Sequence, residues 1–146
     1  MFVSQILKSK SDDSVVTLPP GATVASVAEL LTSRRIGAVV ISIDGKKVAG
    51  IVSERDVVRE LVRRGPACFS DSVEGIMTAK VATCTRHDRA DDILQRMTDG
   101  RFRHLPVVEE GQMVGLISIG DVVKARLSEL SMENDALEGM IKGNRF

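Results

Sequence analysis

A chain of 146 residues, 43% hydrophobic and 27% charged, has the composition of an ordinary globular protein, built as one compact unit or two very small ones. Its 20 basic and 20 acidic residues cancel, which argues against broad binding to nucleic acids or anionic membranes. No apolar run is long enough to cross a membrane, and the N-terminal MFVSQILKSK lacks the features of a secretory signal. We therefore expect a cytoplasmic protein.

In chain order, the first half predicts a strand, an amphipathic helix capped near Thr23, two strands joined at Asp44-Gly45, and a second amphipathic helix. These elements fall at residues 15–18, 24–31, 36–43, 47–53 and 54–64. The second half predicts the same order, with a helix capped near Asp88 and a turn at Glu110-Gly111. Its elements fall at residues 81–84, 93–97, 102–109, 113–118 and 120–130.

The two halves are copies of one another. Residues 17–45 align with residues 83–111 without a gap, at an offset of 66 that becomes 65 after Gly45. Self-similarity at a fixed spacing indicates one supersecondary unit used twice, and one such unit cannot bury its own core. We therefore expect an α/β (α+β) fold, in which two β-α-β-β-α modules face each other in one globule.

The domain boundaries follow from this repeat. We expect module 1 at residues 14–64, a linker at 65–76 that begins with Gly65 and Pro66, and module 2 at 77–130. Residues 1–13 are then an N-terminal extension. Residues 131–146 form a C-terminal tail, which either continues the last helix or packs loosely on the core or on a partner.

A nine-residue motif carries the repeat most clearly. GIVSERDVV at residues 50–58 returns as GLISIGDVV at 115–123, with Ser at the end of a strand and Asp in the first helical turn. One interpretation is a helix cap, because this spacing is typical of a capping box. A second interpretation is a nucleotide site, since a helix N-terminus attracts phosphate and a carboxylate accepts hydrogen bonds from two ribose hydroxyls. The two interpretations are compatible.

Cysteines and histidines offer no metal site, because Cys68 and Cys84 form no CxxC pair and lack a histidine cluster. We expect two free thiols in a reducing compartment and no required metal. The arginines Arg59, Arg63 and Arg64 alternate with glutamates, which is typical of a solvated helix face.

The chain resembles a tandem pair of CBS domains, the modules named after cystathionine β-synthase. The resemblance rests on the two nine-residue motifs, the IMT of residues 76–78 and the stretch RHLPVVEEGQMVGLIS. The resemblance covers about residues 14–130. It implies two α/β modules related by a pseudo-twofold axis, commonly paired into a homodimer. It also implies adenosine nucleotides bound in clefts to which both modules contribute.

Carried over residue by residue, the resemblance implies two unequal clefts. In the first, Asp56 would hold the ribose, and Arg103 and His104 the phosphate, within the set Ile51, Ser53, Arg55, Asp56, Lys80, Val81, Ala82, Arg103, His104 and Pro106. In the second, the resemblance implies Leu116, Ser118, Gly120 and Asp121 facing Val15, Val16, Gly37, Ala38 and Val40. This second cleft has little to hold a phosphate, unless Arg34 or Arg35 reaches it.

The leading hypothesis is therefore a non-enzymatic, energy-sensing regulatory module. Its ligand is an adenosine nucleotide, with AMP favoured and ATP, ADP and NAD left open, and its output is read by an unidentified regulated protein. No nucleophile set, Walker loop or GxGxxG motif supports an enzyme. The alternative is a protein-interaction or dimerisation module with vestigial clefts. A nucleic-acid binder is disfavoured by the zero net charge.

Overall fold

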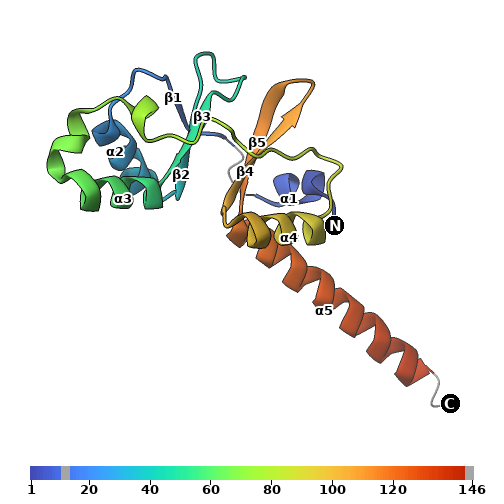
Figure 1. Cartoon of the computed structure of the whole chain (residues 1–146). Coiled ribbons are helices and arrows are strands. Elements are labelled where there is room, and N and C mark those ends of the chain that lie inside the picture. Colours follow the sequence, from blue (N-terminus) through green and yellow to red (C-terminus); the bar gives the residue numbers. More distant parts are fainter. Residues whose placement is uncertain (11–13, 144–146) are drawn as a thin grey trace.

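The computed structural model describes residues 1–10 and 14–143, and shows two α/β modules side by side with a long helix extending from the second (Figure 1). In chain order the elements are α1 (Val3–Ser9), β1 (Thr17–Leu18), α2 (Val24–Arg34), β2 (Ala38–Ile41), β3 (Gly50–Ser53), α3 (Glu54–Arg64), the 3-10 turns η1 (Pro66–Ser70) and η2 (Val73–Gly75), α4 (Ala90–Gly100), β4 (His104–Glu109), β5 (Gln112–Ser118) and α5 (Ile119–Gly143). The predicted fold class is confirmed.

The first module is a three-stranded sheet with two helices on one side of it (Figure 1). Strand β2 lies in the middle, parallel to β1 and antiparallel to β3. All four residues of β2 are buried, as expected for a continuous apolar run at the centre of a sheet. Helix α2 begins at the predicted cap, because the Thr23 hydroxyl accepts a hydrogen bond from the Ser26 amide.

The second module is built on the antiparallel pair β4–β5. Its tight turn is the predicted Glu110-Gly111, where both residues have positive φ, 51° and 77°, as a two-residue hairpin requires. The strand predicted at residues 81–84 is reduced to one parallel bridge between Cys84 and Val107. This sheet therefore has two strands where the first module has three.

The second-module helix predicted to start near Asp88 starts one residue later, and the prediction that Asp88 caps it is wrong. Helix α4 begins after Arg89, whose side chain makes no cap, and the Asp88 carboxylate accepts instead from the Thr85 amide, 2.8 Å away. The first amide of α4, that of Ala90, donates to the backbone carbonyl of Met1. The N-terminal segment of the chain thus satisfies a donor that a side-chain cap would otherwise serve.

Each module is completed by a segment from outside its own repeat. Val3 and Ile6 of α1 lie in the core of the second module, and Val73 of η2 lies in the core of the first. The backbone contacts are equivalent, since the Val3 amide donates to Asp88 and the Val73 amide to Ala22, each at 2.9 Å. The predicted N-terminal extension therefore packs in the second module, and the predicted linker packs in the first.

Helix α5 starts at the end of β5 and runs far beyond the second module (Figure 1). Of the two alternatives for the tail, the continuing helix is the one observed as far as Gly143, and residues 144–146 lie outside the described residues. Several of its apolar side chains are exposed: Val123, Leu127, Leu130, Met132, Leu137 and Met140.

Candidate functional site

Both repeated motifs form reciprocal hydrogen bonds at a strand-to-helix corner. In the first module, Ser53 donates its backbone amide to Asp56 Oδ2 at 2.8 Å, and its hydroxyl accepts from the Asp56 amide at 3.3 Å. In the second, Ser118 and Asp121 make the same two bonds at 2.9 and 3.1 Å. The capping interpretation thus holds in both copies. It also fixes each carboxylate in the first turn of a helix, whose first amide, that of Glu54 or Ile119, donates to the carbonyl of Gly37 or Arg103.

The first corner opens into a cavity of about 470 Å³, to which both modules contribute. The cavity brings together nine of the residues expected there: Ile51, Ser53, Arg55, Asp56, Lys80, Val81, Ala82, Arg103 and His104. Pro106 does not line it, because it is buried within β4 opposite Leu116. The size falls within the range of small-molecule sites.

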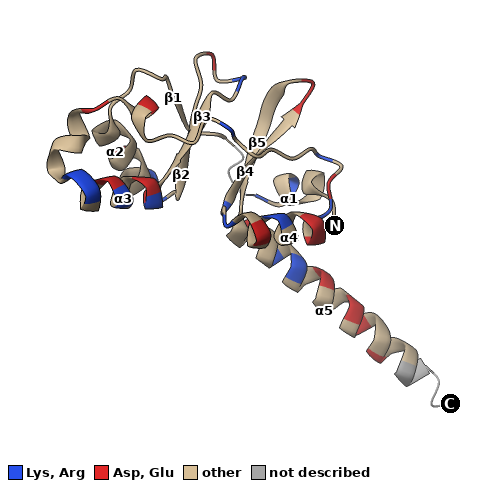
Figure 2. Cartoon of the chain, in the orientation of Figure 1, with Lys and Arg blue, Asp and Glu red and all other residues tan. Residues whose placement is uncertain are grey.

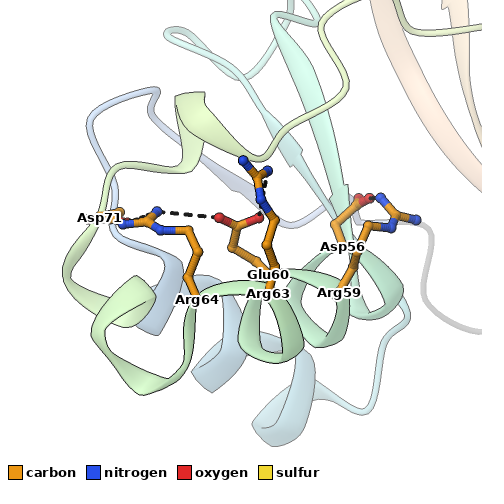
Figure 3. Close-up of polar contacts among 6 residues, drawn as sticks. All are labelled: Asp56, Arg59, Glu60, Arg63, Arg64 and Asp71. Atoms are coloured by element: carbon orange, nitrogen blue, oxygen red, sulfur yellow. Dashed lines mark hydrogen bonds and ion pairs between the residues drawn. The ribbon is translucent and has the colours of Figure 1, made fainter.

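Gly37, expected in the second cleft, lines the first one instead. The sequence reasoning missed six other lining residues: Glu54, Arg59, Thr78, Gly100, Arg101 and Phe102. Arg59 could have been found from its spacing, since it lies one helical turn beyond Asp56 and donates to Asp56 Oδ1 at 3.2 Å (Figure 3). Its side chain is 72% exposed, so this ion pair contributes little and opens readily.

Arg63 and Arg64, the last two residues of α3, form a separate network and do not line the cleft (Figure 3). The buried carboxylate of Glu60 accepts a hydrogen bond from the Arg64 guanidinium at 3.3 Å, and its other oxygen lies 3.9 Å from the guanidinium of Arg63. Arg64 also pairs with Asp71, at the end of η1, and this contact raises the pKa of the Arg64 guanidinium. The face of α3 that carries Arg59, Arg63 and Arg64 is therefore exposed, as expected. Arg64 also connects the segment between the modules to the first module, through its ion pair with Asp71.

His104 lies between the two corners. Its side chain lines the first cleft, while its backbone is paired opposite Ser118 of the second corner. A Cβ placed on Gly37 would come within 2.9 Å of the imidazole, so a glycine there admits the ring. Burial lowers the pKa of His104 below its ordinary value of 6.5, against the opposing charges of Glu54 and Asp121. The imidazole is therefore mainly neutral at pH 7.

The second corner has a partner that the sequence reasoning did not find. Lys10, directly after α1, places its ammonium 3.1 Å from Asp121 Oδ2 and 2.8 Å from the Leu116 carbonyl. Burial raises the pKa of Asp121, but hydrogen bonds from Ser118 and Lys10, together with the lysine charge, outweigh it and leave that pKa lowered. The sequence does contain a pattern that could have predicted this contact. Residues 1–10 align with residues 71–80 at an offset of 70, which makes Lys10 the counterpart of Lys80, a residue expected in the first cleft.

A cavity of about 360 Å³ lies at this second corner. It is lined by Met1, Ile6, Ser9, Lys10, Asp121, Lys124, Ala125 and Ser128. Of the residues expected in the second cleft, Asp121 lines this cavity, and the Ser118 amide donates a hydrogen bond to the Asp121 carboxylate. Val16 and Ala38 do not line it: Ala38 is buried in β2 opposite Ser53, and Val16 is half-buried beside β2.

Within residues 1–10 and 14–143, no group of His, Cys, Asp and Glu side chains could hold a metal ion. Both cysteines are free and buried, and burial raises the pKa of the Cys84 thiol to about 12. In the same part of the chain, no helix is long and apolar enough to span a membrane.

Comparisons with known proteins agree with this geometry. A family model described as the CBS domain matches residues 3–63 and 73–128. The chain is 43% identical to a CBS-domain containing protein from Agrobacterium tumefaciens, with a TM-score of 0.81 over 86% of this chain and 92% of that one. It is 35% identical to a mitochondrial CBS domain-containing protein of Arabidopsis thaliana, over 97% of this chain and 72% of that protein.

A more distant structure holds a ligand. A CBS domain protein from Pyrobaculum aerophilum, complexed with AMP, is 28% identical with a TM-score of 0.76, over 90% of this chain and 99% of that one. Some curated relatives are much longer than this chain, which spans 24% of one from Arabidopsis thaliana.

Proposed function

Because this chain belongs to the CBS-domain family, as a tandem pair of modules, we propose that it is a non-enzymatic regulatory module that binds an adenosine nucleotide in its first cleft. AMP is the favoured ligand, and ATP, ADP and NAD are the alternatives. The family match and the related Pyrobaculum aerophilum protein complexed with AMP support the general proposal of nucleotide binding. The choice of ligand and cleft rests on the side chains of this chain.

The observation that carries the proposal is the pairing of one anchored carboxylate with several cations in a single cavity. Oδ2 of Asp56 is held by Ser53, whereas Oδ1 contacts only the exposed Arg59 among the described residues. A ribose diol can displace an exposed arginine at little cost. The described residues that line the cleft also include the basic side chains Arg55, Lys80, Arg101 and Arg103, which suit a phosphate.

The regulatory mechanism follows from the composite cleft. Asp56 belongs to the first module, and Arg103 and His104 to the second, so a nucleotide that contacts both sides favours the arrangement in which they are closest. The ligand shifts the equilibrium by its difference in affinity for the two arrangements. A regulated partner protein then responds to the position of the modules or of α5.

Isothermal titration of the protein with AMP, ADP, ATP and NAD tests the proposal. Asp56→Ala should weaken AMP binding by about tenfold to a hundredfold, because a charged acceptor of two hydroxyls is lost. Asp92→Ala, an exposed carboxylate on α4 outside both cavities, is the matched control and should bind as the wild type does. Failure of all four ligands to bind the wild-type protein would contradict the proposal.

A protein-interaction module remains the second candidate, because one observation favours it. Exposed apolar residues recur along α5 at Val123, Leu127, Leu130 and Leu137, and we call these four residues the α5 stripe. Their spacing of four, three and seven residues is typical of a helix that packs against another helix. Val58 and Val62 expose the equivalent face of α3. We therefore propose a homodimer formed through these two helices, which is compatible with nucleotide binding.

A further inference from the structure

His104 lies where the two modules meet. It is the first residue of β4 in the second module, and its imidazole packs against Gly37 of the first, where a Cβ would come within 2.9 Å of both Cε1 and Nε2. The residue is half-buried, and its ring lines the first cleft without a hydrogen bond to any described residue. A partly buried imidazole that lacks a hydrogen-bond partner favours its neutral form.

Charged groups on both modules face this ring. Glu54, at the start of α3, and Asp121, in the first turn of α5, favour the protonated imidazole, whereas Lys10, after α1, and the neighbouring Arg103 oppose it. Burial is the largest influence, and it lowers the pKa of His104 below its ordinary value of 6.5. The ring of the unliganded protein is therefore mainly neutral at pH 7, close to two carboxylates that would stabilise its charge.

A phosphate in the first cleft would change this balance. Histidine is the side chain whose charge ordinarily changes near neutral pH, and His104 is the one histidine among the described residues that line the cleft. The other ionisable side chains that line it are Glu54, Arg55, Asp56, Arg59, Lys80, Arg101 and Arg103. A phosphate monoester brings about 1.5 to 2 negative charges. Negative charge beside an imidazole raises its pKa, so a bound phosphate should draw a proton onto His104.

We propose that nucleotide binding in the first cleft is coupled to the uptake of a proton by His104, so that this chain binds a phosphorylated adenosine ligand more tightly as the pH falls from about 8 to about 6.5. The proposal rests on the proposed function of the first cleft, and it adds the proton as a second input to that site. Because His104 belongs to one module and packs against the other, its charge also depends on how the modules are arranged.

The proton can be followed in the wild-type protein, because the chain has only two histidines. Their imidazole C–H signals are recorded by NMR against pH without ligand, with AMP and with adenosine, and His87→Gln assigns them. We expect AMP to raise the titration midpoint of His104 by about one pH unit or more, because the phosphate stabilises the imidazolium. Adenosine, which lacks the phosphate, should leave the midpoint of His104 in place. The exposed His87 should respond to neither ligand.

Calorimetry measures the same proton through the affinity for AMP. At pH 7 the observed heat should depend on the ionisation enthalpy of the buffer, and the Kd should decrease about threefold to tenfold from about pH 8 to about pH 6.5. The range ends there because a phosphate monoester itself takes up a proton near about pH 6. His104→Gln keeps polar groups on the side chain without a titrating charge, and it should lose both effects. His87→Gln is the matched control and should keep them.

Three results would overturn the coupling and leave the proposed function in place. The first is AMP that binds the wild-type protein without moving the His104 midpoint. The second is an equal movement with adenosine, which would assign the proton to closure of the modules. The third is an unchanged buffer dependence in His104→Gln. Failure of AMP, ADP, ATP and NAD to bind would overturn both proposals. If His104→Gln is unstable in thermal unfolding, the NMR titration decides, because it needs no substitution at this position.

Discussion

Ser53 and Ser118 hold the two acidic side chains of the clefts in the same way, yet the cations on those side chains differ. Asp56 is paired with Arg59, whose side chain is 72% exposed, and Asp121 with the half-buried Lys10. A partly buried ion pair is screened less by solvent than an exposed one. We therefore expect the first carboxylate to be the easier of the two for a ribose to reach.

His104 predicts a pH dependence of stability. Its pKa is lowered in the folded protein because the ring is buried, so the unfolded state binds more protons between that pKa and 6.5. The free energy of unfolding should therefore keep its full value above pH 6.5, where His104 is neutral in both states. It should decrease as the pH falls from 6.5 through the lowered pKa of His104. Urea unfolding between about pH 5 and pH 8 measures it.

The matched variants for this measurement are His104→Gln and His87→Gln. The first removes the buried ring and should flatten the decrease below pH 6.5. The second removes an exposed histidine and should leave it in place. A decrease of the same size in both variants would show that another group causes it.

Helix α1 is short, and its stability comes from the module that receives it. A helix of seven residues is marginal in water by itself, and two of its side chains, Val3 and Ile6, are at most 2% exposed in the second module. The close approach is tight, since a Cβ on Gly115 would come within 2.7 Å of Leu7. The segment therefore acts as part of the second module's core.

Ile6→Ala tests this role of α1. The substitution leaves a cavity in a core, and we expect it to lower the free energy of unfolding by about 2 to 5 kcal/mol in urea denaturation. Leu127→Ala removes a similar side chain that is 62% exposed, and it should change stability by much less. Equal effects from the two variants would contradict the assignment of α1 to the core.

At the scale of the whole molecule, charge and apolar surface are distributed differently. Basic and acidic residues alternate over both modules and along α3 (Figure 2), in keeping with the zero net charge. Apolar side chains are exposed instead on α3 and α5, at equivalent positions of the repeat such as Val58 and Val123. A surface of this kind is typical of a protein-protein interface.

The homodimer can be tested on the α5 stripe. Leu127→Glu places a charge in the middle of the proposed interface, so we expect the mass measured by light scattering to fall from that of two chains to that of one. Met132→Glu is the matched control, because Met132 is 65% exposed on the same helix and lies outside the stripe. A wild-type protein that is already monomeric would exclude this dimer.

Much of the fold could be predicted because the chain repeats itself, and most residues of the first cleft because the chain resembles a pair of CBS domains. The repeated Ser and Asp are only three residues apart, so local spacing alone placed Asp56 and Asp121 at helix starts, where the structure has them. The turn at Glu110-Gly111 was equally local, since only positive φ closes so short a hairpin.

The remainder depended on contacts between distant segments. Asp88 failed as a cap because the N-terminus of the chain supplies the bond to α4, and Lys10 reaches Asp121 across more than a hundred residues. The sequence by itself determined the repeated unit, the buried strand β2 and the helix caps at Thr23, Ser53 and Ser118, because these arise from neighbouring residues. Only the tertiary structure decided that α1 and the inter-module segment exchange places, since burial of Val3 and Val73 needs a core that their own neighbours do not provide.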